Sequence, residues 1–278
     1  MIIDGRQIAE EILGNIWGDI ASKHAKLKLS AVLVGSNPEF RKFVEIKGRV
    51  AEKIGVSFEM HQFHEDITTE DLRKEVRGIS GESDGVLVEL PLPSHIDVQV
   101  VLNEVPAGKD VDVLSEEAQS RFYEVQPRKN TEVEPRVLPP AVEAMKIVLE
   151  KYKIEPKGKK ACVFGWGLLV GKPIAHWLEQ EGAEVSIVRS ATENPENYSR
   201  EADIIVSGVG KPGLINGSMV KDGVVVFDFG YENKEGKMVG DVDFDSVAPK
   251  AALFTPVPGG MGPIVIVAVL KNLILLNS

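Results

Sequence analysis

The stretch that decides the fold is KKACVFGWGLLVGKPIAHWLEQEGA, residues 159–183. An apolar run leads into Gly165, Gly167 and Gly171, and a segment of helical periodicity follows. Glycine permits a sharp turn and lets backbone N–H groups approach a pyrophosphate, whose charge the next helix N-terminus stabilises. The stretch therefore predicts a Rossmann unit that binds a dinucleotide. Because the spacing G-x-G-x-x-x-G is one residue longer than the common fingerprint, a tight turn without a ligand is the alternative.

The end of the next predicted strand bears on the cofactor. NAD-dependent enzymes commonly place an acidic residue there, which hydrogen-bonds the ribose 2′-hydroxyl. This chain instead has Arg189 and Ser190, a cation and a hydroxyl where a 2′-phosphate would lie. NADP is therefore favoured, with NAD as the second possibility. The alternative for Arg189 is a solvated charge at the end of a strand.

Apolar runs alternate with helical segments along the whole chain, which predicts an α/β fold around mostly parallel sheets. A loop is expected at 123–137 between the halves, and a β-hairpin at 229–242, whose edge is a candidate for pairing with a second subunit. The expected helices are 6–24, 38–54, 68–79, 141–152, 170–182, 196–201 and one from Pro263, and the expected strands are 28–34, 56–63, 84–89, 159–164, 184–188, 203–206 and 224–228.

Composition excludes several classes of protein. Apolar residues make up 43% and charged residues 27% of 278 residues, which suits two folded domains. A net charge of -10 argues against nucleic acid or an anionic membrane as a partner. The N-terminal residues do not resemble a signal peptide, and the apolar stretch 264–276 is too short to span a bilayer. With Cys162 as the single cysteine, we expect a cytoplasmic protein. The histidines lack partners at ligand spacing, so no metal site is expected.

Several unusual strings occur in order along the chain. They are GSNP at 35–38, Phe43 with Lys47, ELPLP at 89–93, KDVD at 109–112, VGKPG at 209–213, VGDV at 239–242 and TPVPGGMGP at 255–263. Together they resemble the methylenetetrahydrofolate dehydrogenase/methenyltetrahydrofolate cyclohydrolase family. The resemblance implies a folate-binding domain at 1–138 completed by the last helix, 263–278, a Rossmann domain at 139–262, and a cleft between them. It also implies oxidation of 5,10-methylenetetrahydrofolate with NADP, hydrolysis to 10-formyltetrahydrofolate, a role in one-carbon metabolism and purine biosynthesis, and a homodimer.

The resemblance also implies site residues. Phe43 and Lys47 lie four apart and so share one face of a helix. Lys47, Glu89 and Asp112 are the expected catalytic residues. The expected substrate-binding residues are Phe43, Lys47, Glu89, Leu90, Pro91, Asp112, Pro258, Gly259 and Gly260. The expected cofactor-binding residues are Gly165, Trp166, Gly167, Arg189, Ser190, Val209, Gly210 and Tyr231.

Departures from the family pattern affect the expected activity, and one is Phe43, which keeps the flat ring of the family's tyrosine but lacks its hydroxyl. The family usually has glutamine where this chain has Glu89, and a carboxylate beside Lys47 favours the ammonium form, which cannot accept a proton. We therefore expect weakened hydrolysis. The alternatives are full bifunctional activity with Glu89 in the proton transfers, and a binding protein without turnover. Trp166 and Gly167 replace a common Arg-Ser, and Arg189 is expected to compensate.

Overall fold

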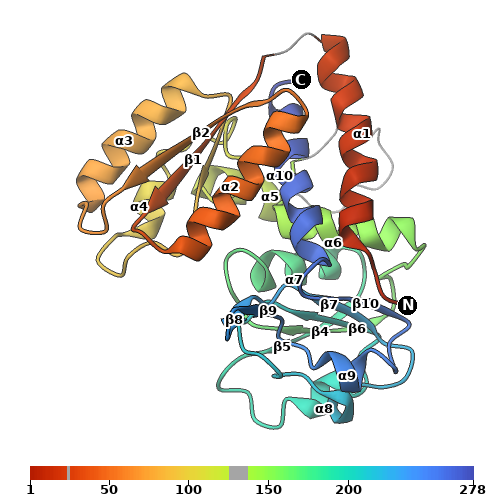
Figure 1. The fold of residues 1–278 in the computed structure, drawn as a ribbon. Coiled ribbons are helices and arrows are strands. Elements are labelled where there is room, and N and C mark those ends of the chain that lie inside the picture. The colour runs from red at the N-terminus through yellow and green to blue at the C-terminus, as the bar shows by residue number, and fades with distance from the viewer. Residues whose placement is uncertain (24–25, 125–136) are drawn as a thin grey trace. The chain divides into compact units, whose positions relative to one another are not determined.

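The computed structural model describes residues 1–23, 26–124 and 137–278 (Figure 1). Their contacts divide them into two compact units. The C-terminal unit comprises residues 1–10 and 141–265, and the N-terminal unit comprises the described residues of 11–124 together with 137–140 and 266–278. Each unit is described by itself.

The C-terminal unit is built on a five-stranded parallel sheet of order β10-β7-β6-β4-β5. Its strands are β4 (Lys160–Phe164), β5 (Glu184–Val188), β6 (Ile204–Ser207), β7 (Val225–Asp228) and β10 (Leu253–Thr255). Its helices are α6 (Pro140–Lys151), of which Pro140 belongs to the other unit, α7 (Gly171–Gln180), α8 (Glu196–Ser199), α9 (Phe244–Val247) and the 3-10 turn η1 (Gly217–Met219). The predicted strand, turn and helix at 159–183 are confirmed.

Burial explains why the apolar runs of this unit form central strands. Every residue of β6 and β7 is buried, as expected for strands covered on both faces. Cys162 lies in β4 within the core and is fully buried. Gly182 follows α7 with a φ of +83°, the left-handed conformation that ends a helix.

The N-terminal unit holds a three-stranded parallel sheet of order β2-β1-β3. Its strands are β1 (Lys28–Val34), β2 (Ser57–Phe63) and β3 (Gly85–Val88). Its helices are α2 (Pro38–Lys53), α3 (Thr69–Glu82), α4 (Val98–Leu102) and α5 (Glu116–Tyr123). Side chains of Asn37, Thr68, Asp97 and Ser115 cap the starts of these four helices by accepting backbone N–H bonds.

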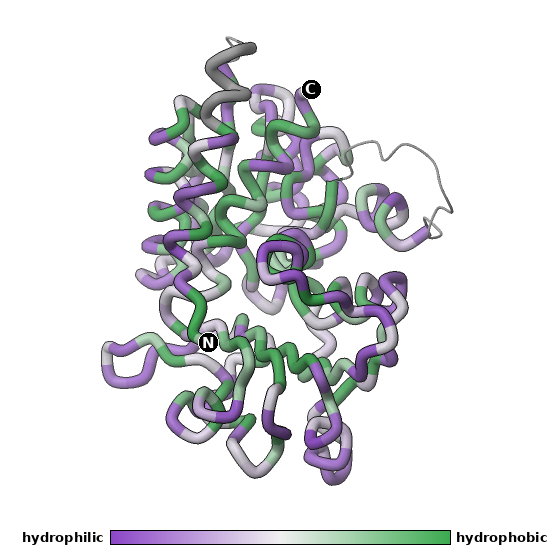
Figure 2. Tube along the Cα trace, turned by 90° about the vertical axis from the view of Figure 1, so that its right-hand side faces the viewer, coloured by the Kyte–Doolittle hydropathy of each residue, from purple (hydrophilic) through white to green (hydrophobic). Residues whose placement is uncertain are grey.

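Helices α1 (Gly5–Lys23) and α10 (Met261–Leu276) contribute residues to both units. The helix that rises from the N-terminus in Figure 2 alternates green and purple segments, as its buried Ile8 and exposed Glu10 indicate. In α10, Asn272 is buried, and its amide donates to the carbonyl oxygens of Val111 at 2.9 Å and Leu138 at 2.7 Å. None of the described helices is both long and apolar enough to cross a membrane.

The short elements of the structure confirm one prediction from the sequence and add elements that were not predicted. The hairpin expected at 229–242 is confirmed as β8 (Glu232–Lys234) and β9 (Lys237–Val239). Four short elements (α4, α5, α9 and η1) and the edge strand β10 were not predicted, because they span three to eight residues and show too little periodicity. The predicted loop at 123–137 lies mostly outside the described residues, and Tyr123 ends α5.

Candidate functional site

Helix α2 supplies the first part of the site in the N-terminal unit. The Asn37 side chain accepts the N–H of Glu39 at 2.8 Å, which fixes the start of the helix. Phe43 and Lys47 then lie one turn apart, and the Lys47 Nζ is 4.7 Å from the centroid of the Phe43 ring. The predicted sharing of one helical face is confirmed, and the apolar ring borders the ammonium group.

Glu89 supplies the second part. It follows β3, and its backbone N–H donates to the Val32 carbonyl at 2.9 Å, so the strand pairing places it. Lys47 Nζ donates to Glu89 Oε2 at 2.7 Å, and each side chain is only 9% exposed. The two groups thus form a buried ion pair between residues 42 positions apart in the chain. Leu90 and Pro91 follow directly, joined by a cis peptide bond.

Asp112 lies close enough to interact electrostatically with both Lys47 and Glu89. Burial raises its pKa to about 7, the positive charge of Lys47 opposes this rise, and the carboxyls of Asp110 and Glu89 add to it. The group can therefore both donate and accept a hydrogen bond near neutral pH. The neighbouring Asp110 has a structural role, since its carboxylate accepts the N–H groups of Leu114 and Ser115 and the Ser115 hydroxyl.

In the C-terminal unit, the glycine turn connects β4 to α7. Gly165 has a φ of +93°, and a Cβ on Gly171 would clash with the Gly165 carbonyl, so both positions require glycine. A Cβ on Gly167 would meet nothing within 4 Å, which leaves open space beside the turn. The turn thus has the room and the helix N-terminus that a pyrophosphate needs.

Trp166 and Arg189 come together at this turn. Phe164 and Val188 are register partners in adjacent strands, and the Gly165 N–H donates to the Val188 carbonyl at 2.8 Å. The Arg189 guanidinium carbon lies 4.8 Å from the centroid of the Trp166 ring, which is a cation–π contact. Ser190 is exposed beside them.

A buried carboxylate that the sequence did not single out organises the neighbouring loop. Asp241 accepts the Ser207 hydroxyl at 2.6 Å and the backbone N–H groups of Val209 at 2.7 Å and Lys211 at 2.6 Å. A second carboxylate, Asp228, in turn accepts the N–H of Asp241 at 3.2 Å. The one available signal was VGDV, in which an aspartate stands among apolar residues and glycine.

Other predicted residues lie in the same unit. A Cβ on Gly210 would be 3.5 Å from the Tyr231 carbonyl oxygen, so the structure brings the loop of Val209 and Gly210 beside Tyr231. Pro258, Gly259 and Gly260 form the turn before α10, where the Gly260 N–H donates to the Pro256 carbonyl at 2.7 Å. These three belong to the C-terminal unit, whereas Phe43, Lys47, Glu89, Leu90, Pro91 and Asp112 belong to the N-terminal unit.

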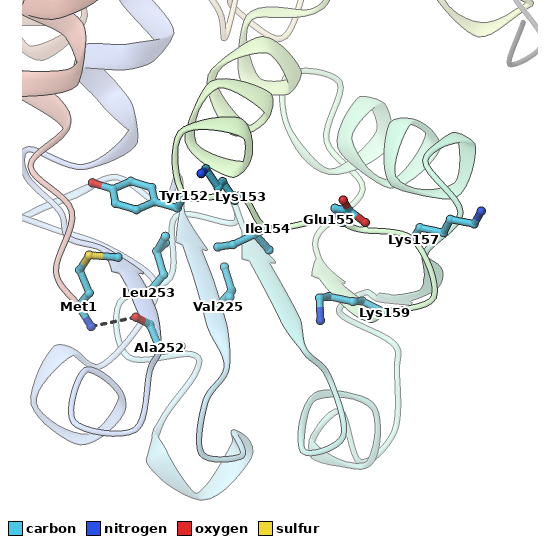
Figure 3. A pocket seen from close by; sticks show the side chains of 10 residues that line it. All are labelled: Met1, Tyr152, Lys153, Ile154, Glu155, Lys157, Lys159, Val225, Ala252 and Leu253. Atoms are coloured by element: carbon cyan, nitrogen blue, oxygen red, sulfur yellow. Dashed lines mark hydrogen bonds between the residues drawn. The ribbon is translucent and has the colours of Figure 1, made fainter. Parts of the chain in front are cut away.

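One cavity lies away from all the predicted site residues. It has a volume of about 540 Å³ and is lined by the starts of β7 and β10 and the residues that precede β4 (Figure 3). The Met1 amine at its rim donates to the Ala252 carbonyl at 2.9 Å. Ligands of open α/β sheets bind at the carboxyl ends of the strands, so this cavity at the opposite ends is not the expected cofactor site. Within the described part of the chain, no cluster of three His, Cys, Asp or Glu side chains could hold a metal ion.

Comparison with known proteins identifies the family of the chain. Residues 3–112 match the family model of the tetrahydrofolate dehydrogenase/cyclohydrolase catalytic domain, and residues 139–278 match that of its NAD(P)-binding domain. The bifunctional protein FolD of Hydrogenobaculum is 35% identical over 273 residues, which cover 98% of this chain and 96% of the relative.

Solved structures agree. The bifunctional dehydrogenase/cyclohydrolase of Campylobacter jejuni is 32% identical with a TM-score of 0.90, covering 99% of this chain and 97% of the other. The Trypanosoma brucei enzyme, solved with NADP and an inhibitor, is 31% identical with a TM-score of 0.92, covering 99% and 96%. The resemblance in the sequence strings is therefore confirmed, and the chain belongs to the tetrahydrofolate dehydrogenase/cyclohydrolase family of enzymes.

Proposed function

We propose that the chain oxidises 5,10-methylenetetrahydrofolate to 5,10-methenyltetrahydrofolate with NADP and hydrolyses the methenyl product only weakly. The family membership supports the pair of reactions. The observation that supports the imbalance between them is the buried ion pair of Lys47 and Glu89, with 2.7 Å between Nζ and Oε2.

The hydrolytic step requires proton transfers that this ion pair opposes. Water adds to the methenyl carbon and loses a proton, and a ring C–N bond then breaks to leave the 10-formyl product. A lysine can accept that proton only as a neutral amine, and the carboxylate of Glu89 stabilises the ammonium form of Lys47 instead. Since both side chains are almost entirely shielded from water, solvent does little to screen this attraction. The first reaction does not depend on a neutral amine.

The substrate-binding side chains suit a flat, polar-edged ring system. Phe43 offers an apolar face beside Lys47, on which a pterin or benzoyl ring can pack. Asp112, with a pKa near 7, offers a carboxyl that can pair with the ring nitrogens as donor or acceptor. We propose that Leu90, Pro91 and the turn at 258–260 complete the folate site.

We propose that the glycine turn of the C-terminal unit holds NADP. The fit rests on the open space beside Gly167 and on the close packing of Gly165 against Gly171, which aims the start of α7 at the turn. Arg189 and Ser190 would hold the 2′-phosphate, and Val209, Gly210 and Tyr231 would line the nicotinamide end. NADP supplies the hydride acceptor for the oxidation.

Purified protein tests the proposal directly. With methylenetetrahydrofolate and NADP, the methenyl product should accumulate before the 10-formyl product, as followed by absorbance. Rapid hydrolysis of added methenyltetrahydrofolate would contradict the weakened second step and leave the oxidation intact. Absence of NADP reduction would contradict the first.

A second candidate is full bifunctional activity with Glu89 as an acid/base group. The observation that favours it is that Lys47 interacts with two carboxyls, of which Asp112 titrates near neutral pH. A proton could then pass between carboxyls without a neutral amine. Replacement of Glu89 by glutamine separates the two candidates, because faster hydrolysis supports the weakened step and slower hydrolysis supports an active role of Glu89.

The domain bounds, the pairing of two copies and the cellular compartment are also part of the proposal. We propose that residues 1–138, completed by 263–278, form the folate-binding domain and that 139–262 form the dinucleotide-binding domain. The β8–β9 hairpin supports pairing of two copies, because its outer edges have no strand partner in the described chain. The single buried Cys162 is consistent with the cytoplasm, where thiols stay reduced.

A further inference from the structure

We infer that Trp166 is a positioning residue that holds Arg189 ready for the 2′-phosphate and so sets the preference for NADP over NAD. The inference rests on the proposed role of Arg189 and adds a role for the tryptophan that replaces the usual arginine of the turn. The observation that carries it is the cation–π contact in which the Arg189 guanidinium carbon lies 4.8 Å from the centroid of the Trp166 ring.

The sheet brings the two residues together. Trp166 comes two residues after the end of β4, and Arg189 comes directly after the end of β5. These strands are neighbours in the sheet, and a hydrogen bond from the Gly165 N–H to the Val188 carbonyl joins their carboxyl ends. The end of this second strand is where dinucleotide-binding folds recognise the ribose 2′ position.

The backbone of Arg189 is fixed on its other side. Its N–H donates to the Thr192 hydroxyl at 2.9 Å, and its carbonyl accepts the Thr192 N–H at 2.9 Å. The conformational freedom of Arg189 therefore lies in its long side chain, and the contact with the indole ring restricts that side chain. Restriction of this kind before binding lowers the entropy that a ligand must remove.

The charge of Arg189 is available to a ligand. Among the described residues, the ion pairs of arginine involve Arg41, Arg73, Arg77 and Arg121 and not Arg189. A cation–π contact uses no N–H donor of the guanidinium, so these donors stay available to bind a phosphate in a bidentate manner. Trp166 itself is 39% exposed, so the pair lies at an accessible surface of the turn.

The expected effects differ between two nucleotides. The probes are 2′,5′-ADP, which carries the 2′-phosphate, and 5′-AMP, which lacks it. Arg189→Ala should weaken 2′,5′-ADP binding about 10- to 100-fold, the range of a charge-assisted hydrogen bond. Trp166→Ala should weaken it about three- to fivefold, the range of an exposed cation–π contact, and Trp166→Phe should restore part of the loss. Neither change should alter 5′-AMP binding.

Calorimetry on the full chain tests the inference with these variants and the double variant. Trp166→Ala should lower the preference for 2′,5′-ADP in the wild type and have no further effect once Arg189 is alanine. Leu169→Ala is the matched control, since Leu169 is a large apolar side chain of the same turn, is 46% exposed and cannot form a cation–π contact.

The outcomes distinguish the positioning role of Trp166 from the phosphate-binding role of Arg189. An equal loss of 5′-AMP binding in Trp166→Ala, or a loss that persists in the Arg189→Ala background, would show that the ring contacts the nucleotide directly and would overturn the inference. An unchanged preference in Arg189→Ala would instead overturn the proposed role of Arg189, and the inference with it.

Discussion

Replacement of Glu89 by glutamine removes one charge from the buried pair and keeps the shape of the side chain. At 2.7 Å and an effective dielectric constant of 20, the attraction is about 6 kcal/mol before desolvation. Desolvation offsets most of this, and hydrogen bonds between charged groups retain about 1.5–3 kcal/mol. This is the free energy with which the Glu89 carboxylate holds the Lys47 Nζ as a hydrogen-bond donor, and Glu89→Gln removes the charge from that bond. We expect hydrolysis of methenyltetrahydrofolate to accelerate about tenfold or more.

The assay follows the loss of added methenyltetrahydrofolate, with NADP reduction from methylenetetrahydrofolate measured in parallel. Glu59→Gln is the matched control, because Glu59 forms an ion pair with Lys28 at 2.6 Å but is 49% exposed. It should leave both rates unchanged. A slower hydrolysis in Glu89→Gln would refute the reasoning and assign Glu89 an active part in the proton transfers, and an unchanged rate would show that the pair does not limit the step.

Three further predictions concern stability. Because the pKa of Asp112 rises from 3.8 to about 7 in the folded protein, its contribution to stability falls as pH rises from 4 to 7. Between pH 4 and pH 7, the free energy of unfolding of Asp112→Asn should therefore fall by about 2 kcal/mol less than that of the wild type, as measured by urea unfolding. Equal falls in the two proteins would contradict this prediction. Asp241→Asn should lower the free energy of unfolding by about 2–4 kcal/mol, since an amide cannot accept all of the buried donors; an unchanged urea midpoint would exclude this role. Gly171→Ala should cost about 1–3 kcal/mol by its clash with Gly165, whereas Gly167→Ala, in open space, should cost little.

Local patterns account for how much of the fold could be predicted. The strand Lys28–Val34 has the predicted bounds, because a run of buried apolar residues ends at a glycine. By contrast, β10 spans three residues next to a proline- and glycine-rich turn, and its strand character comes from pairing with β7. Helix α5 depends on the Ser115 cap and on packing that no local period marks.

The candidate site likewise has features that a local sequence pattern predicts and features that depend on tertiary packing. The shared face of Phe43 and Lys47 follows from helical spacing, so the sequence predicts it. The resemblance predicts Glu89 beside Lys47, but no local pattern does, because the contact joins segments 42 residues apart and requires the packing of α2 on the sheet. Asp241 escaped prediction because its partners are backbone N–H groups about 30 residues away, which carry no residue-specific pattern.

The buried amide of Asn272 has a consequence for synthesis on the ribosome. It bonds to carbonyls 161 and 134 residues earlier, and Leu273 beside it fills the space over Gly85 in β3. The N-terminal unit therefore lacks part of its core until the final helix has left the exit tunnel, after residues 141–265 of the other unit have been translated. Residues 11–124 are thus synthesised well before the helix that completes their core.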